Sequence, residues 1–228
     1  MPRIPRCFTL DNDHQTHKMW SSHDKDWNIS TFEEKAAYMD SLNKFLKKQS
    51  NELNVFTLMS NHTHEIYDIL NKEEFSNLMR NHHSRYGMWF NRKHQRRGKV
   101  AYERPKTCLI EDDEYSMRAT FYIHANPVRA GITKNAASYR WSTHNLYAFG
   151  KRDEFTKNVR FPGWYMELGG TWEDRQRKYR QLFDFYLEEE GLIKQEFLQK
   201  RFFGSMLWTT DHAKEVSDWL KSRSGDPP

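Results

Sequence analysis

The spacing of apolar residues in the middle of the chain predicts two strands followed by a helix. Between residues 53 and 70, β-branched and aromatic residues surround a polar centre at Ser60-Asn61, which predicts extended chain broken near that centre. Residues 75–90 instead place apolar side chains at helical spacing. A helix is also expected over about residues 31–48, because the capping-box pattern Ser30-Thr31-Phe32-Glu33 precedes an apolar face.

The flanking segments complete an alternating order of elements. Residues 8–20 contain a first strand of unclear bounds, and residues 100–102 and 107–110 are short extended candidates. Asp112 or Asp113 can cap a helix that runs to Ala125. The order strand, helix, strand pair, helix, short strand, helix predicts an α+β fold, with a small antiparallel sheet and helices packed on one side.

Residues 151–228 are expected to form a helical extension to an α+β domain of residues 1–150. Acidic and basic residues balance within the extension, so the whole net charge of +5 lies in residues 1–150. Ser222–Pro228 is expected to be a disordered tail. The extension is expected to position a substrate or bind a partner. Its predicted helices, separated by glycines, are Asp174–Glu189, Leu192–Phe203 and Ala213–Leu220.

Composition narrows the class of protein. The apolar fraction is modest at 37%, but aromatic residues make up 15% and can build a core, because each ring buries a large area. Cys7 and Cys108 do not make a disulfide framework, so intracellular thiols are expected. No apolar run approaches the roughly 20 residues of a membrane helix, and no signal peptide is visible. We therefore expect a cytoplasmic protein without a membrane partner.

Basic residues gather between Arg80 and Lys106, where Glu103 is the single acidic residue. Aromatic residues interleave with them, and helical spacing assigns two of these, Tyr86 and Trp89, to the core. Basic groups that contact phosphates beside rings that stack on bases are typical of single-strand nucleic-acid binding, although a solvated face remains the ordinary alternative. The candidate DNA-binding residues here are Arg85, Arg92, Lys93, Arg96, Arg97, Lys99, Arg104 and Lys106.

Two histidines lie in the polar centre between the predicted strands. Because side chains alternate along a strand, His62 and His64 point to the same face about 7 Å apart, with Thr63 on the other face. Two imidazoles on one face can chelate a divalent metal, but the same pattern also occurs as plain polar groups on a half-exposed strand. The histidines near the N-terminus, His14, His17 and His23, are assigned to the surface and not to this site.

A second stretch, Tyr122 to Gly131, offers a phenol beside an amide. Tyr122 and Asn126 are four residues apart on a predicted helix and so share one face. Pro127 is expected to end that helix soon after Asn126. Taken alone, Tyr122 is typical of a core aromatic residue and Asn126 of a helix cap. Arg129, just beyond, can contact a phosphate or join an ion pair.

These two stretches together carry a resemblance to a known family. Met59–His64 and Tyr122–Gly131 resemble the motifs of the REP-associated tyrosine transposases and their single-tyrosine insertion-sequence relatives, which belong to the HUH superfamily of single-strand DNA nucleases. Phe90-Asn91-Arg92, Gly98-Lys99-Val100 and Tyr139–Ser142 match as well, and the similarity covers roughly residues 53–150.

The resemblance implies a ferredoxin-like HUH nuclease domain and a role for each matching residue. His62 and His64 match the two metal-binding histidines, Tyr122 the nucleophile, and Asn126 the residue that completes the metal site. The family usually has a bulky apolar residue where this chain has Thr63. We therefore expect looser packing behind the strand but an intact metal site.

The implied chemistry is a metal-assisted transesterification. A free phenol titrates near pH ~10, so Tyr122 needs help to act as a nucleophile. A divalent cation can polarise and orient the phosphodiester, and two imidazoles with one amide oxygen suit Mg²⁺ or Mn²⁺. Imidazole ligands by themselves favour Mn²⁺ or Zn²⁺, so the identity of the metal stays open. Attack would leave a 5′-phosphotyrosine, which the freed 3′-hydroxyl can later reverse.

Three functions remain open at this point. The leading hypothesis is a metal-dependent endonuclease and strand transferase acting on single-stranded or hairpin DNA. The alternative is a non-cleaving module, derived from such a transposase, that binds structured DNA or RNA. A weaker alternative is a zinc hydrolase that uses the histidines alone. Relatives act as monomers or as homodimers that exchange the tyrosine helix, and both states remain open for this chain.

Overall fold

A computed structural model describes residues 5, 8–12, 14–22, 27–101, 103–189 and 201–224. Cys7, His23 and Tyr102 lie outside these residues, as does most of the predicted helix Leu192–Phe203.

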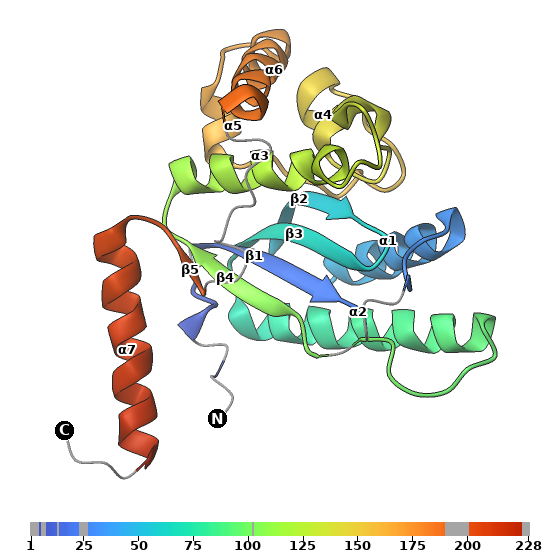
Figure 1. Ribbon diagram of the computed structural model, residues 1–228, viewed down its shortest axis with the longest axis vertical. Coiled ribbons are helices and arrows are strands. Elements are labelled where there is room, and N and C mark those ends of the chain that lie inside the picture. The colour runs from blue at the N-terminus through green and yellow to red at the C-terminus, as the bar shows by residue number, and fades with distance from the viewer. Residues whose placement is uncertain are drawn as a thin grey trace.

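A five-stranded sheet forms the centre of the molecule (Figure 1). The strands are β1 (His14–Ser21), β2 (Glu52–Leu58), β3 (His62–Ile69), β4 (Lys106–Ile110) and β5 (Phe202–Phe203). Their order across the sheet is β2-β3-β1-β4-β5, with antiparallel pairing throughout except for the parallel pair β4–β5. With α1 and α2 inserted, the chain order β1-α1-β2-β3-α2-β4 and the strand order are those of a ferredoxin-like sheet. The predicted order of elements is confirmed.

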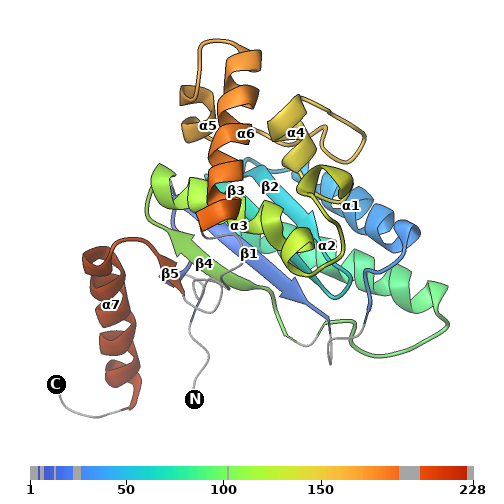
Figure 2. The same cartoon turned by 45° about the horizontal axis from the view of Figure 1, so that its top comes forward.

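Helices cover both faces of this sheet. α1 (Phe32–Leu46) and α2 (Lys72–Lys93) lie on one face, and α3 (Asp113–Arg129) crosses the other (Figures 1 and 2). The prediction that helices pack on one side is therefore wrong. Helices are needed on both faces because the sheet is apolar on both. In β2 the adjacent residues Val55 and Phe56 point to opposite faces, and both are fully buried.

Local signals place the helix starts to within a residue. Thr31 caps α1, since its hydroxyl accepts from the Glu34 N–H (3.2 Å) while the Glu34 carboxylate accepts from the Thr31 N–H (2.9 Å). This capping box lies one residue later than the predicted Ser30–Glu33 pattern. Asp112 caps α3 as predicted, through a hydrogen bond from the Tyr115 N–H.

The end of α3 differs from the prediction. The helix continues through Pro127 to Arg129, and the Ala130 N–H still donates to the Asn126 carbonyl (2.9 Å). Pro127 removes only its own N–H from the ladder, and tertiary packing holds the remaining turn. Ala130 caps the helix, and the chain turns away at Gly131, whose φ of +68° is left-handed and favours glycine.

The rest of the chain is largely helical and is tied to the sheet domain. It comprises a 3₁₀ turn at Ala136–Ser138, α4 (His144–Phe149), α5 (Gly163–Glu167), α6 (Trp172–Glu189) and α7 (Met206–Ser224). α6 packs on α3, where the Phe121 and Tyr179 rings meet at 5.6 Å, and β5 pairs with β4. The division of the chain at residue 150 stays a prediction. No helix in the described part of the chain is both long and apolar enough to cross a membrane.

Several predictions made for the C-terminal part and the core can be checked against the structure. The helix predicted over Asp174–Glu189 is confirmed as α6, and Ala213–Leu220 lies within the longer α7, which also includes residues 222–224 of the predicted tail. Phe202–Phe203 form a strand, not a helix, because they pair with β4. Tyr86 is buried as predicted, and Trp89 packs against the core from a half-buried position.

Candidate functional site

Two imidazoles lie on one face of β3, an inner strand of the sheet. The ring centroids of His62 and His64 are 4.9 Å apart, with the planes at 85°. Thr63 points to the opposite face as predicted, and its hydroxyl donates to Glu65 Oε1 (3.0 Å). Packing behind the strand is not loose, however, because Thr63 is fully buried in a hydrogen-bonded cluster.

Burial keeps both imidazoles neutral at pH 7. It lowers the pKa of His62 to about 4. It also lowers the pKa of His64 well below its usual value, and the neighbouring His62, His17 and Arg129 lower that pKa further. A neutral imidazole keeps one nitrogen lone pair, which is the form that binds a metal.

Tyr122 lies on the same side of the sheet as these histidines. Its ring on α3 is 6.3 Å from the His64 ring, centroid to centroid, with the planes at 87°. Burial raises the pKa of the Tyr122 phenol, and the Arg129 charge opposes part of that rise. The phenol therefore keeps its proton at neutral pH, and any attack by its oxygen requires a group that takes the proton.

Arg129 joins Tyr122 and Asn126 into one unit at the end of α3. Its guanidinium carbon lies 3.7 Å from the Tyr122 ring centroid. One terminal nitrogen donates to the Tyr122 carbonyl (2.7 Å) and to Asn126 Oδ1 (3.0 Å). The other terminal nitrogen, and Asn126 Nδ2, are buried without a hydrogen-bond partner among the described residues. Buried donors without partners are costly, so these two atoms are candidates to donate hydrogen bonds to a ligand.

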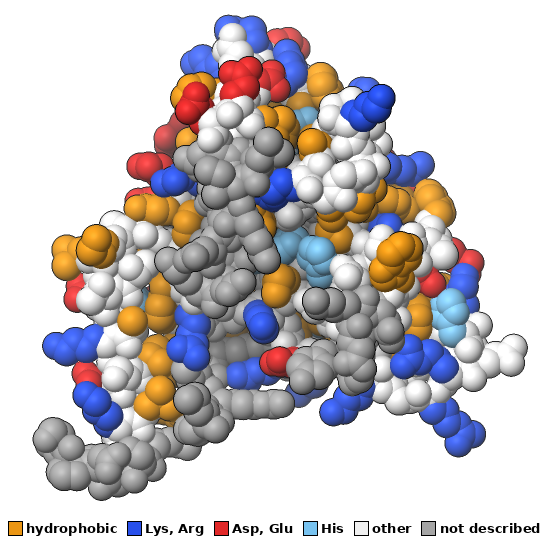
Figure 3. Space-filling view, in the orientation of Figure 1, with side chains coloured by type: hydrophobic (Ala, Val, Ile, Leu, Met, Phe, Trp, Pro, Cys, Tyr) orange, Lys and Arg blue, Asp and Glu red, His pale blue; other side chains and the backbone are white. Residues whose placement is uncertain are grey.

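Some of the predicted basic residues lie beside this face. Lys106 on β4 pairs with Met19 on β1, which pairs with His64 on β3, so all three side chains share one face of the sheet. Ala101, two residues after the predicted DNA contact Lys99, forms an isolated β-bridge with Ser22. Ser22 follows Ser21, which pairs with His62, so this part of the chain also runs near the histidines. Figure 3 shows histidine side chains near the middle of one face, with Lys and Arg side chains beside them.

Other basic residues lie elsewhere or already have partners. Arg85 and Arg92 are exposed on α2, which is on the opposite face of the sheet from α3 (Figure 1). Lys93 forms an ion pair with Glu33 of α1. Half-buried Arg96 donates to the Lys99 carbonyl (3.1 Å). The remaining predicted residues, all exposed, are Arg97, Lys99 and Arg104.

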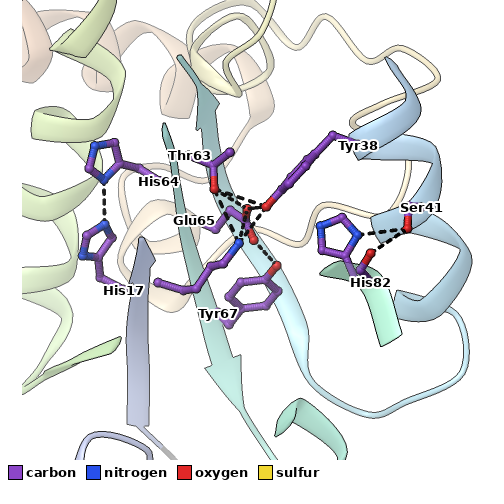
Figure 4. Close-up of polar contacts among 9 residues, drawn as sticks. His17, Tyr38, Ser41, Thr63, His64, Glu65, Tyr67 and His82 are labelled. Carbon is purple, nitrogen blue, oxygen red and sulfur yellow. Dashed lines mark hydrogen bonds and ion pairs between the residues drawn. The ribbon is translucent and has the colours of Figure 1, made fainter. Parts of the chain in front are cut away.

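His17 lies beside this site, although the sequence analysis predicted a surface position for it. Its side chain is 2% exposed, and its Nε2 lies 3.0 Å from His64 Nδ1 (Figure 4). The assignment was wrong because β1 pairs with β3, which puts His17 diagonally across from His64. That pairing joins segments 47 residues apart, and the alternation within β1 was the available signal.

The residues able to hold a metal are His62, His64 and, from α3, Asn126. No group of three or more His, Cys, Asp or Glu side chains suited to a metal occurs within the described ranges, so a third ligand to a cation bound here would have to be another residue type. The Asn126 amide oxygen is such a donor and sits one helical turn from Tyr122. Two neutral imidazoles and an amide oxygen fit a divalent cation that keeps open coordination positions.

A solved structure shares this architecture. It is described as the structure of a REP-associated tyrosine transposase bound to a REP hairpin, and it matches with a TM-score of 0.55 and 16% sequence identity over 71% of this chain and 99% of that chain. At this identity the similarity shows the fold, and it confirms the predicted α+β architecture of a sheet with helices packed on it. No protein-family model matches the chain, and no curated protein does.

Proposed function

We propose that the protein is a metal-dependent endonuclease and transesterase, transposase-like, that acts on single-stranded or hairpin DNA. The observation that carries the proposal is the approach of Tyr122 on α3 to the His64 ring on β3, 6.3 Å apart. The fold is shared with a tyrosine transposase bound to a REP hairpin, and this similarity supports DNA as the substrate.

His62, His64 and Asn126 are the proposed ligands of a divalent cation, Mg²⁺ or Mn²⁺. When bound, the cation would polarise the scissile phosphodiester and hold it in line with the nucleophile. Both imidazoles are neutral and ready to bind it, because burial lowers the pKa of each.

Tyr122 is the proposed nucleophile. Its oxygen attacks the phosphorus, a tyrosine–phosphorus bond forms, and the bond from phosphorus to the 3′ oxygen breaks. The departing oxygen gains a proton as the phenol loses one, so the step is balanced without a further reactant. The 5′-phosphotyrosine keeps the energy of the phosphodiester, and a 3′-hydroxyl can reverse the step.

Arg129 is the proposed phosphate contact closest to the nucleophile. Its guanidinium stacks on the Tyr122 ring, and its buried nitrogen without a partner among the described residues can donate to a phosphate oxygen. Basic side chains would hold the flanking DNA, with Lys106 nearest to the histidines by register. The remaining proposed DNA contacts are Arg85, Arg92, Lys93, Arg96, Arg97, Lys99 and Arg104.

The test is covalent capture of a labelled hairpin. Protein, hairpin and Mn²⁺ should give a protein–DNA adduct that survives denaturation, and Tyr122→Phe should remove it. Tyr115→Phe is a matched control, because Tyr115 lies on the same helix two turns earlier and should keep the adduct. An adduct of normal yield with Tyr122→Phe would overturn the assignment of the nucleophile.

The alternative is a module that binds structured DNA or RNA without cutting it. Two observations favour it: burial raises the pKa of Tyr122, and Arg129 holds the Asn126 oxygen that the metal would need. Tight hairpin binding without an adduct, over a range of hairpins and with Mg²⁺ or Mn²⁺, would select this function.

A further inference from the structure

The two histidines of β3 each use the same ring nitrogen for a contact within the protein. His62 Nδ1 lies 2.7 Å from Asn61 Oδ1, and His64 Nδ1 lies 3.0 Å from His17 Nε2. An amide oxygen only accepts hydrogen bonds, so the proton of His62 must be on Nδ1. This leaves the lone pair of His62 on Nε2.

For His64 the direction of the bond decides the chemistry. If His17 donated, His64 would carry its proton on Nε2 and could not offer that atom to a cation. If His64 donates, its lone pair is on Nε2, as in His62, and the two rings present equivalent atoms.

We propose that His17 is a positioning residue, which accepts the Nδ1 proton of His64 and thereby fixes the tautomer that presents Nε2 to a divalent cation. Asn61 does the same for His62. This inference rests on the proposed function, and it adds two residues that act through the ligands and do not touch the metal.

The geometry of the histidine pair supports a directed hydrogen bond. The two ring planes differ by 18° at a centroid distance of 5.2 Å, so the bond runs close to the plane of both rings. Both rings are buried, at 2% and 1% exposure, and water therefore does not compete for either nitrogen. Figure 4 shows this contact on one side of the β1–β3 pair and the contacts of Thr63, Glu65 and Tyr38 on the other.

The strand register that brings His17 to His64 is itself held by a buried charge pair. Lys18 and Glu65 are directly opposite in the register, and their side chains form an ion pair at 2.8 Å on the other face of the sheet. A slip of one residue would separate this pair and turn His17 to the wrong face. Lys18 therefore stabilises the β1–β3 register, and the same register places the neighbouring His17 beside His64.

Nitrogen-15 NMR of the metal-free, histidine-labelled full chain tests the tautomers directly. Signals of His62 and His64 are assigned by their loss in His62→Gln and His64→Gln. We expect a protonated Nδ1 and an unprotonated Nε2 in both rings. A proton on Nε2 of His64 would overturn the inference, whether or not the protein cuts DNA.

Mn²⁺ titration of the protein tests the consequence. His17→Leu removes the acceptor and should weaken Mn²⁺ binding by about 10- to 100-fold. His17→Gln offers an amide oxygen near the position of Nε2 and should restore affinity to within about 3-fold, while His14→Leu, on the same strand, should leave it unchanged. Thermal unfolding of each variant identifies loss of fold.

The outcomes separate this inference from the proposed function. Normal Mn²⁺ affinity in His17→Leu, equal losses in His17→Leu and His17→Gln, or no Mn²⁺ binding by the wild-type protein would each overturn it. If the tautomers and affinities are as expected but no covalent adduct forms, the metal site stands and the nuclease proposal fails.

Discussion

Both faces of β3 carry polar side chains, but the two sets differ in how far their hydrogen-bonding groups have partners within the chain. Thr63, Glu65 and Tyr67 point toward α1 and α2, whereas His62 and His64 point toward α3. Neighbours along one strand thus enter two environments, and the difference separates the part of the molecule that holds the fold from the part proposed to act.

On the α1–α2 face five neighbouring polar side chains are hydrogen-bonded to one another. Lys18 Nζ donates to Glu65 Oε1 (2.8 Å), Tyr38 OH (2.7 Å) and Thr63 Oγ1 (3.4 Å), and Tyr67 donates to the other Glu65 oxygen (Figure 4). Burial pushes the pKa of Glu65 up, but the Lys18 charge and the hydrogen bonds outweigh it, and the net pKa is lowered. We call this group of five residues the sealed cluster.

On the α3 face polar capacity is left over. The imidazoles are neutral, and one nitrogen of Arg129 and one of Asn126 are buried without partners among the described residues. A buried donor without a partner costs free energy, and a ligand that accepts its hydrogen bond would remove that cost. Among the described residues, unused hydrogen-bonding capacity also occurs on the other face, at His82 Nε2 and Thr16 Oγ1. The comparison therefore teaches that neither burial nor an unpartnered atom marks a site by itself; the α3 face is distinguished by unpartnered donors that lie on the helix of Tyr122, whose ring approaches His64.

The largest expected effect comes from breaking the α3 face at His64. His64→Ala should slow adduct formation by more than about 100-fold, because it removes one of three proposed metal ligands. Hairpin affinity should change by less than about 3-fold, since phosphate contacts dominate it. Adduct yield over time and hairpin titration measure the two.

Thr63→Val, a change within the sealed cluster, is the matched control. It removes one hydroxyl from the neighbouring position, and should cost about 1 kcal/mol of stability while leaving adduct formation unchanged. Equal losses of cleavage and binding in His64→Ala would contradict the separation of the two faces.

Breaking the sealed cluster should affect stability instead. Glu65→Ala leaves the Lys18 charge buried without its carboxylate, which should lower the free energy of unfolding by about 3–5 kcal/mol. The double variant Lys18→Met/Glu65→Leu should recover most of that loss, because it removes both charges. Urea unfolding measures both, and a loss below about 1 kcal/mol in Glu65→Ala would show that the cluster does not hold the fold.

Local features of this fold were predictable from the sequence. The helix spacing of residues 75–90 and the caps at Thr31 and Asp112 depend on neighbours a few residues apart. They lie at, or within one residue of, the positions that periodicity and capping chemistry predict. The hairpin of β2 and β3 around Ser60-Asn61 is local in the same sense.

Features that depend on distant pairing were not predictable. Phe202–Phe203 were predicted to belong to a helix, yet they pair with β4. His17 was predicted to lie at the surface, and only the pairing of β1 with β3 shows that it is buried beside His64. The motif residues Tyr122 and His64 were found through a resemblance, and only the fold shows that their rings approach each other.

Acid should weaken both faces through their buried histidines. Burial lowers the pKa of His17 and of His82 to about 3, whereas the unfolded chain titrates near 6.5. The unfolded state therefore binds more protons below pH 6.5, and stability is complete above that pH and falls as pH decreases toward the folded pKa. Each buried histidine should contribute a loss of about 1.4 kcal/mol per pH unit.

Urea unfolding between pH 6.5 and 5, in EDTA, measures this slope. Glu65 does not interfere, because its lowered pKa makes its contribution fall only below about pH 4.5. His17→Gln on the α3 face and His82→Gln beside the sealed cluster should each make the slope shallower by about 1.4 kcal/mol per pH unit. A slope unchanged in His17→Gln would mean that His17 is not buried in the neutral form.

The smallest expected effect distinguishes which surface the DNA follows. Lys106 shares the face and register row of His64, whereas Arg85 is exposed on α2, beyond the opposite face of the sheet. Lys106→Ala should reduce the slope of log affinity against log salt by about 0.7–1, with a few-fold loss of hairpin affinity. Arg85→Ala should leave the slope unchanged if DNA stays on the α3 side. Equal effects would instead require the DNA to pass around the edge of the sheet, and the basic residues of both faces would then form one continuous path that ends at Tyr122.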